Sequence, residues 1–437
     1  MKTLTIVALI AAFAVSGLAQ KFTEANNPPA AWSLVFLESA ARRKALPESR
    51  ARVALAEAVE IKNADALESG GVPNYIRAMA QNTKAAPQFA NLVQTFLFGG
   101  TVAPETKMAM GLRIAQLYGS GYLYAHTARW LRASAKGQSL LKDWEDRRSF
   151  SDAEKTALEY AEKLTGDIHG VSEEDFARAR GFYNDSQLIE LTMTVCFFNH
   201  FVRFVEATGL PVEDWVLNDK APKFDASVNK TVPPPARVAL VSDGEMTQAQ
   251  TILETAKKAQ TENPRQSLGL GIANSQRAFL RVPALGQAWR DFGFQNRASW
   301  TIDRSIQLQI SFAVSMANGC RYCTLHQVLG LRRLGVDPKK LLAMKKDDSA
   351  LTPRELTAVE FARKLTKQPA SVTDADFEKL KKEFGEQGAV EVVLQTGAFA
   401  FMNRFTDGLR LPSEDEAVKT YQEVYGDGAY RDWKLPK

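Results

Sequence analysis

The chain has few of the residues that carry redox and metal chemistry, with only three cysteines and four histidines among 437 residues. So few cysteines exclude a disulfide framework, which is how many small secreted domains are held together. The net charge of +5 is small for this length, and Lys and Arg are scattered among Asp and Glu. This pattern argues against a nucleic-acid partner and against a basic membrane anchor. No alternating apolar and polar run of strand length is joined to hairpin residues, so the sequence predicts an all-α fold.

Long apolar runs are also scarce, because no stretch beyond the first residues approaches the roughly 20 that a membrane span needs. At the N-terminus, Lys2 precedes a short apolar run over residues 4–15, and small residues follow at 16–19 before Gln20. This arrangement is typical of a secretory signal peptide, with an anchor helix as the alternative. We predict a signal peptide over residues 1–19 and a periplasmic or secreted protein with no membrane span after signal cleavage.

Two of the three cysteines and one of the histidines lie within seven residues, as Cys320, Cys323 and His326. On a helix, residues three apart share a face, so the three side chains form one stripe. The preceding Asn-Gly pair predicts that a helix begins here, where free N–H groups and the helix dipole stabilise a thiolate. One thiol could attack, the second could resolve, and His326 could favour the thiolate. We therefore take these three residues as the candidate catalytic site.

Other roles for the CxxC pair were weighed. A structural disulfide here would close almost no loop and stabilise little. Zinc binding lacks a second ligand pair at a suitable spacing, and covalent haem attachment requires a histidine where Thr324 stands. A redox dithiol is favoured, with no metal and no cofactor. Cys196 lies in an apolar run and is predicted to be a buried core thiol.

The chain also contains an internal repeat. Residues Phe150–Thr165 align with Leu351–Thr366, and Val171–Phe176 align with Val372–Phe377, at an offset of about 200 residues. Apolar spacing, helix-capping residues and charges agree along both pairs. We interpret the chain as a tandem duplication of one helical unit.

The repeat divides the chain into domains of unequal chemistry. We predict an N-terminal domain over residues 20–216, a proline-containing linker over 217–236 and a C-terminal domain over 237–437. At the positions of the two cysteines, the N-terminal copy has Ser120 and Leu123. The first copy therefore cannot perform dithiol chemistry, although it keeps a histidine at the equivalent position.

The sequence Asn-Gly-Cys-Arg-Tyr-Cys at 318–323, followed by a histidine-bearing helix and by Asn403-Arg404-Phe405, resembles the alkylhydroperoxidase D / carboxymuconolactone decarboxylase superfamily. The resemblance covers residues 270–416 well and 72–216 more weakly. It implies two tandem all-helical domains, a homo-oligomer, and thiol-dependent activity in members that keep the CxxC. It also implies that Cys323 meets the peroxide and Cys320 resolves it.

Two departures from the family pattern stand out. His326 follows Cys323 by three residues instead of four, and Leu308 stands where the family carries a glutamate of a proton relay. The function expected is an exported thiol peroxidase or thiol-disulfide oxidoreductase, acting on a small hydroperoxide or disulfide and recharged by a thiol reductant. The alternative is a decarboxylase-like enzyme or ligand-binding member that does not use its thiols.

Overall fold

The computed structural model describes residues 51–56, 71–82, 85–217, 273–293, 297 and 300–431. The predicted signal peptide and nearly all of the predicted linker lie outside these ranges. Within them the secondary structure is helical and contains no strand, which confirms the all-α class.

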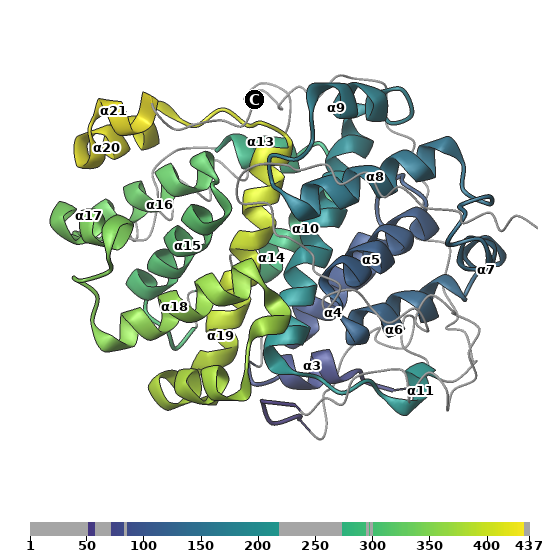
Figure 1. The fold of residues 1–437 in the computed structure, drawn as a ribbon, viewed down its shortest axis with the longest axis horizontal. Helices are drawn as coiled ribbons and strands as arrows, with labels where there is room; N and C mark the ends of the chain where they lie inside the picture. The colour runs from purple at the N-terminus through teal and green to yellow at the C-terminus, as the bar shows by residue number, and fades with distance from the viewer. Residues whose placement is uncertain are drawn as a thin grey trace, which may run out of the picture.

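The described helices fall into two series along the chain (Figure 1). The first series is α3 (Asn74–Met79), α4 (Ala85–Phe98), α5 (Pro104–Tyr118), α6 (Gly121–Leu131), α7 (Ala135–Lys142), α8 (Asp152–Gly166), α9 (Glu173–Arg180), α10 (Asp185–Thr208) and α11 (Asp214–Leu217). The second is α13 (Asn274–Phe279), α14 (Pro283–Gly293), α15 (Arg304–Asn318), α16 (Arg321–Arg333), α17 (Pro338–Lys346), α18 (Pro353–Lys367), the 3-10 helix η5 (Pro369–Ser371), α19 (Asp374–Gly408), α20 (Asp415–Tyr425) and α21 (Asp427–Arg431).

The two series repeat one order of helices. Helices α5 and α15 begin 200 residues apart, as do α6 and α16, while α8 and α18 begin 201 apart. Helix α19 corresponds to α9 and α10 together, and it is interrupted at Gly385, whose φ of 70° leaves the helical region. The offset equals that of the sequence repeat, and the tandem duplication itself stays a prediction.

Capping residues explain where these helices begin. Ser151 and Thr352 cap α8 and α18, and in each case a glutamate three residues later completes the capping box. Thr373 and Asp337 cap α19 and α17, each accepting a backbone N–H of the first turn with its side chain. The apolar period of residues 274–289 would allow a single helix, but α13 ends at Phe279 and Pro283 occupies the first turn of α14.

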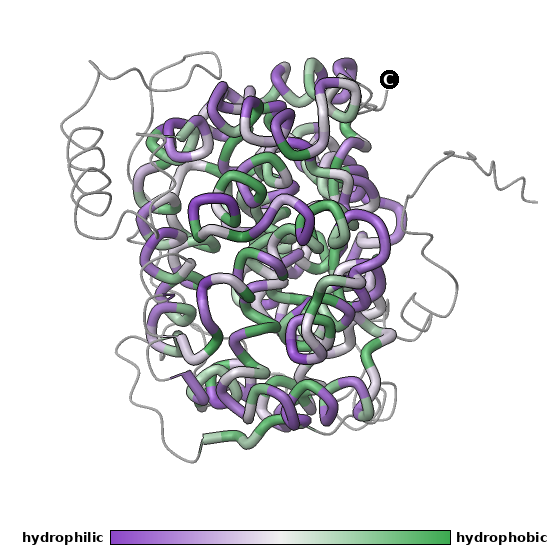
Figure 2. The backbone as a smooth tube through the Cα atoms, turned by 90° about the vertical axis from the view of Figure 1, so that its left-hand side faces the viewer, coloured by the Kyte–Doolittle hydropathy of each residue, from purple (hydrophilic) through white to green (hydrophobic). Residues whose placement is uncertain are grey.

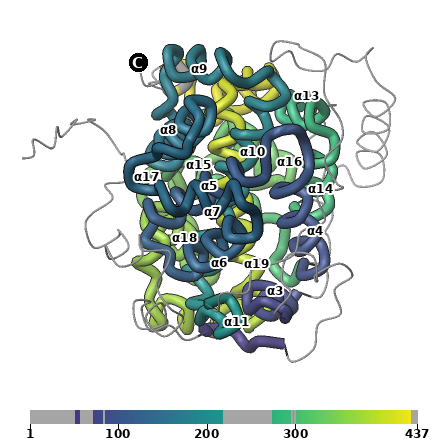
Figure 3. The backbone as a smooth tube through the Cα atoms, turned by 90° about the vertical axis from the view of Figure 1, so that its right-hand side faces the viewer, coloured from purple at the N-terminus to yellow at the C-terminus, as the bar shows by residue number. Residues whose placement is uncertain are grey.

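The two halves pack against each other through α10 and α19, which lie side by side at the centre (Figure 1), and through α4 against α14. Helix α10 is almost wholly buried, and so is the part of α19 that follows Gly388. Apolar residues follow the helices that run through the interior (Figure 2), and viewed from the side the N-terminal helices α5 to α8 stand in front of the C-terminal ones (Figure 3). Helix α10 is long and apolar enough to cross a membrane, but its most apolar window is completely buried in the protein.

Two buried arginines join the halves reciprocally. Arg203 of α10 donates to the carbonyl of Thr366 at 2.9 Å, and Arg404 of α19 donates to the carbonyl of Thr165 at 3.1 Å. Both guanidinium groups also donate to the hydroxyl of Tyr118. Burial would raise the pKa of Tyr118, but the charges of Arg203 and Arg404 outweigh it and lower that pKa. The central interface is therefore polar at its middle and apolar around it.

Candidate functional site

The CxxC pair sits at the junction of α15 and α16. Gly319 ends α15 in the left-handed region, with φ 74°, and its turn places Cys320 at the N-cap of α16. The Cys320 sulfur accepts the backbone N–H of Cys323 at 3.3 Å. The pair thus occupies the N-terminal turn of a helix, as the sequence predicted.

Both sulfurs share one polar neighbour on α19. The Sγ atoms of Cys320 and Cys323 each lie 3.4 Å from the Oγ1 of Thr406. Thr406 also donates its hydroxyl proton to the carbonyl of Met402 at 2.9 Å. Cys320 is fully buried, whereas Cys323 keeps 3% of its surface exposed. The two thiols therefore face the same point, and Cys323 is the more accessible.

A buried carboxyl stands beside Cys320. Burial raises the pKa of the Asp407 carboxyl to about 7, against the opposing effects of a hydrogen bond from Cys320 and of the positive charge of Arg321. Burial also raises the pKa of the Cys320 thiol well above its ordinary value, and the adjacent Cys323 and Asp407 add to that effect. Near neutral pH the Cys320 thiol therefore stays protonated, whereas the Asp407 carboxyl is partly protonated and partly ionised.

The N-terminal half contributes a histidine to this site. The Nε2 of His169, in the loop between α8 and α9, lies 3.3 Å from the carbonyl oxygen of Gly319 and 3.9 Å from the Oδ2 of Asp407. Burial lowers the pKa of His169, and the nearby Arg410 contributes to that lowering. A residue 150 positions upstream thus touches the turn that carries Cys320.

His326 has partners other than the thiols. Its Nδ1 contacts the carbonyl of Tyr322 at 2.6 Å, its Nε2 contacts a carboxylate oxygen of Glu414 at 2.6 Å, and its ring stacks on Tyr322. Tyr322 donates to the same carboxylate at 3.0 Å. Burial would raise the pKa of Glu414, but the hydrogen bond and charge of His326 outweigh it and lower that pKa. The catalytic assignment of His326 stays a prediction, because its two ring nitrogens contact the Tyr322 carbonyl and the Glu414 carboxylate at the start of α20.

The same histidine pairing recurs in the half without thiols. His126 contacts Glu213 at 3.1 Å, and Tyr122 donates to that glutamate at 2.7 Å. The backbone N–H of Asn74 donates to Glu213, just as that of Asn274 donates to Glu414. A pairing present in both halves ties the first helix of each half, α3 or α13, to its fourth, α6 or α16, whether or not cysteines are nearby.

The N-terminal counterpart of the thiol site differs in four positions. Ser120 replaces Cys320 and caps α6, and Leu123 replaces Cys323. Glu206 takes the place of Asp407, and burial raises its pKa to about 7 against a hydrogen bond from Ser120. In the opposite half, Ala370 aligns with His169 at the 201-residue offset. Both sites therefore keep a buried carboxyl, but only one has thiols and a histidine.

The family's relay glutamate has no local replacement on α15. Leu308, which stands in its place, is buried among apolar side chains including Phe312 and Leu325. The neighbouring Gln309 donates to Glu355 at 2.7 Å, away from the sulfurs. The carboxyl that does reach the CxxC pair is Asp407. Sequence reasoning missed it, although it lies three residues after Arg404, and it missed His169, whose only signal was the scarcity of histidine.

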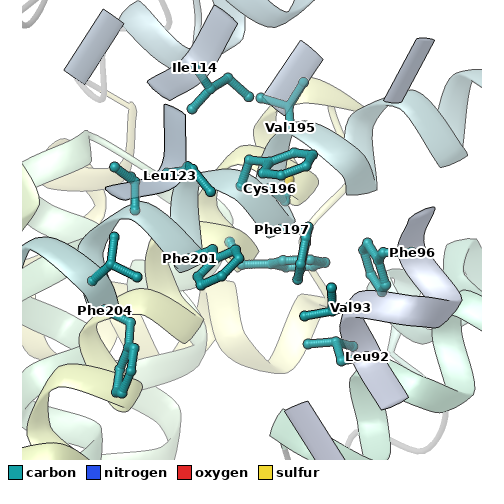
Figure 4. Packing of buried hydrophobic residues seen from close by; sticks show 14 of the residues in the cluster. Leu92, Val93, Phe96, Ile114, Leu123, Val195, Cys196, Phe197, Phe201 and Phe204 are labelled. Atoms are coloured by element: carbon teal, nitrogen blue, oxygen red, sulfur yellow. The ribbon is translucent and has the colours of Figure 1, made fainter. Parts of the chain in front are cut away.

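Cys196 is a core residue, as its apolar setting suggested. It is fully buried on α10 and lies beside Val195 and Phe197 in the packed cluster of Figure 4. Burial raises the pKa of the Cys196 thiol well above its ordinary value, and the nearby Cys323 adds a smaller effect in the same direction. All three cysteines are thiols in this structure. Within the described ranges, no group of three His, Cys, Asp or Glu side chains is arranged to hold a metal ion.

Comparisons with known proteins agree with the sequence resemblance over part of the chain. Two solved structures of the debrominase Bmp8 are similar: a variant in complex with 2,3,4-tribromopyrrole, at 20% identity, and the apo form, at 19%. Each match covers 43% of this chain, and 96% and 97% of the respective Bmp8 chains, with a TM-score of 0.37. This likeness is too distant to bear on activity, and no curated protein matches. Residues 283–364, which include both cysteines of the CxxC pair, match the model of the carboxymuconolactone decarboxylase family.

Proposed function

We propose that this protein is a thiol-dependent oxidoreductase that reduces a small hydroperoxide or disulfide with the Cys320–Cys323 pair. The observation that carries the proposal is that both sulfurs lie 3.4 Å from one hydroxyl, at the N-terminus of a helix. Free N–H groups at that end stabilise a thiolate. The family match supports the helical fold around the CxxC pair, and the redox activity is argued from the two thiols.

Cys323 is the attacking residue, because it is the more accessible of the two thiols and stands in the first turn of α16. With a hydroperoxide, its thiolate sulfur attacks the terminal oxygen, an S–O bond forms, and the O–O bond breaks. The alkoxide leaves as the alcohol after taking a proton, and Cys323 becomes a sulfenic acid. With a disulfide, the same attack forms a mixed disulfide and expels a thiolate.

Cys320 then completes the oxidation. Its sulfur attacks that of Cys323, an S–S bond forms, and hydroxide or the second thiolate leaves and is protonated. The protein has then given up two electrons, and an external dithiol returns them by exchange. Because the thiols are buried, the substrate must be small. The reductant must likewise reach Cys323 through a limited opening.

Thiol titration of the folded protein with and without hydrogen peroxide tests the proposal. Loss of two thiols per chain, abolished by Cys323→Ser and leaving a trapped sulfenic acid in Cys320→Ser, is the expected result. Cys196→Ser is the matched control and should behave as the wild-type protein does. Three unchanged thiols after exposure to both hydrogen peroxide and a small disulfide would refute it.

A decarboxylase-like or ligand-binding function that does not use the thiols is the second candidate, favoured by the family whose model matches residues 283–364. Thiol blocking separates the two, because an activity on a small acidic lactone that survives alkylation of Cys323 would establish this alternative. Export to the periplasm or the cell exterior belongs to the proposal as well, and N-terminal sequencing of the mature protein would test it.

A further inference from the structure

Disulfide formation poses a proton problem at Cys320. This thiol is fully buried, and burial together with its neighbours raises its pKa well above the ordinary value. The thiol must nevertheless lose its proton as it attacks Cys323. The residue that supplies a base in the wider family is replaced by Leu308, so a different group must accept the proton.

We propose that Asp407 is the base that deprotonates Cys320 during disulfide formation, and that His169 of the N-terminal half is a positioning residue that holds the Cys320 turn against Asp407. The inference rests on the proposed function and names the residues that complete it. In this scheme the thiol-less half contributes directly to the chemistry of the other half.

The contacts around Asp407 support its role. Asp407 directly follows Thr406, whose Oγ1 lies 3.4 Å from the Cys320 sulfur, and the Cys320 thiol is near enough to lower the pKa of the Asp407 carboxyl. The Oδ2 of Asp407 is buried with no hydrogen-bond partner among the described residues. A free lone pair beside a thiol that must lose a proton is what a general base requires. Its pKa of about 7 means that a useful fraction of carboxylate is present at neutral pH.

The contacts of His169 support a positioning role. Its Nε2 is 3.3 Å from the carbonyl oxygen of Gly319, the residue that directly precedes Cys320. Nε2–H donation to that carbonyl fixes the left-handed turn from outside the C-terminal half. The same Nε2 is 3.9 Å from the Oδ2 of Asp407, so one ring atom lies near both the turn and the carboxyl.

The proton balance closes without an added reactant. As the Cys320 sulfur bonds to that of Cys323, the thiol proton passes to the Asp407 carboxylate. The hydroxide leaving Cys323 takes up this proton and departs as water, which restores the carboxylate. The charged and titratable groups that face Asp407 are Cys320 and Arg321 from α16 and Asp167 and His169 from the opposite half, and Arg410 acts on His169.

Rapid-quench mass spectrometry of the full chain separates the two oxidation steps. Hydrogen peroxide is the first probe, with dimedone trapping the Cys323 sulfenic acid, and bis(2-hydroxyethyl) disulfide is the second, with the mixed disulfide followed by mass. Asp407→Asn should slow the second step about 100-fold at pH 7.5 and leave the first step unchanged. The second step in the wild-type protein should accelerate with pH around 7, and this dependence should disappear in Asp407→Asn.

Two further variants make the test specific. His169→Ala should slow the second step about tenfold, and His169→Gln, which keeps a donor for the Gly319 carbonyl, should recover most of that loss. Glu206→Gln, which changes the equivalent carboxyl in the thiol-less half, should alter neither step. An unchanged second step in Asp407→Asn, or a wild-type second step that is flat between pH 6 and 8, would overturn the assignment of Asp407.

The outcomes also distinguish this inference from the proposed function. If the thiols are oxidised but Asp407→Asn is indistinguishable from wild type, the dithiol function stands and the base is wrongly assigned. If neither probe oxidises the thiols of the wild-type protein, both proposals fail. If only the disulfide probe reacts, peroxidase activity is excluded but thiol-disulfide exchange is not. The second step can then still be measured with that probe.

Discussion

The two buried carboxyls predict an unusual dependence of stability on pH. Burial raises the pKa of Asp407 from an ordinary 3.8, and that of Glu206 from an ordinary 4.5, to about 7 in each case. A carboxyl with a raised folded-state pKa binds a proton more tightly in the folded than in the unfolded chain. Stability is therefore lost as the pH rises from about 4 to about 7, and replacing the carboxyl by a neutral amide should recover it.

The magnitude follows from the two pKa values. For Asp407 the difference from its ordinary pKa corresponds to about 4 kcal/mol, since each pKa unit is worth about 1.36 kcal/mol. The side chain keeps 12% of its surface exposed, so solvent reduces the cost, and we expect about 2 kcal/mol. Asp407→Asn should therefore be more stable than the wild-type protein at pH 8 by about this amount, with little difference at pH 4.5. Glu206→Gln should behave similarly.

Urea unfolding followed by circular dichroism, at intervals between pH 4.5 and 8, measures this effect. The informative quantity is the change in the free energy of unfolding with pH, because effects of shape and hydrogen bonding on the amide variants are independent of pH. If the advantage of Asp407→Asn at pH 8 equals that at pH 4.5, the carboxyl titrates normally and the reasoning is refuted. If Asp407→Asn is more stable but forms the disulfide more slowly, Asp407 destabilises the folded protein while accelerating the reaction.

Three other predictions follow from the contacts described above. His126→Ala and His326→Ala should each lower the free energy of unfolding by about 2–4 kcal/mol, because each substitution leaves a glutamate without its histidine partner. Slower alkylation of Cys323 in His326→Ala alone would support a catalytic role for His326. Equal alkylation rates in the two variants would assign both histidines to packing. Cys196 should remain reduced while the CxxC pair is oxidised, and a disulfide from Cys196 to either cysteine in peptide mapping would contradict this. Residues 236–437 expressed alone should dimerise or aggregate, because the face of α19 that packs on α10 and the reciprocal bonds of Arg404 would be exposed; a monodisperse monomer by light scattering with full thiol reactivity would show that the N-terminal half is not needed.

Local sequence patterns were enough to predict the helices and the position of the CxxC pair. Capping residues such as Thr352 and Thr373 act within one helical turn, so their effect is readable from neighbouring residues. The left-handed glycine before Cys320 is equally local. Apolar periodicity continues across the turn between α13 and α14, and only the proline at 283 marks the start of a new helix.

The surroundings of the thiols could not be predicted in the same way. Thr406 and Asp407 are 83 or more residues from the cysteines, and His169 comes from the other half of the chain. Helical spacing placed His326 on the same face of α16 as the thiols. A helix face is about 100° wide, so side chains on it can point toward different neighbours. The ring turns toward Glu414, a residue whose proximity depends on how the chain returns after α19. Long-range packing decides such contacts, and one sequence carries no direct signal of it.

The comparison of the two equivalent sites explains why a half without thiols matters to the chemistry. Each site has a buried carboxyl at the end of its long central helix, facing the first residue of a shorter helix across from it. In one site that residue is Ser120, whose hydroxyl needs no deprotonation, and the opposing loop offers only Ala370. In the other it is Cys320, and the opposing loop offers His169. The cysteines and the histidine thus differ together from their counterparts although they lie in opposite halves, which is the arrangement expected if the N-terminal half is a working part of the thiol site.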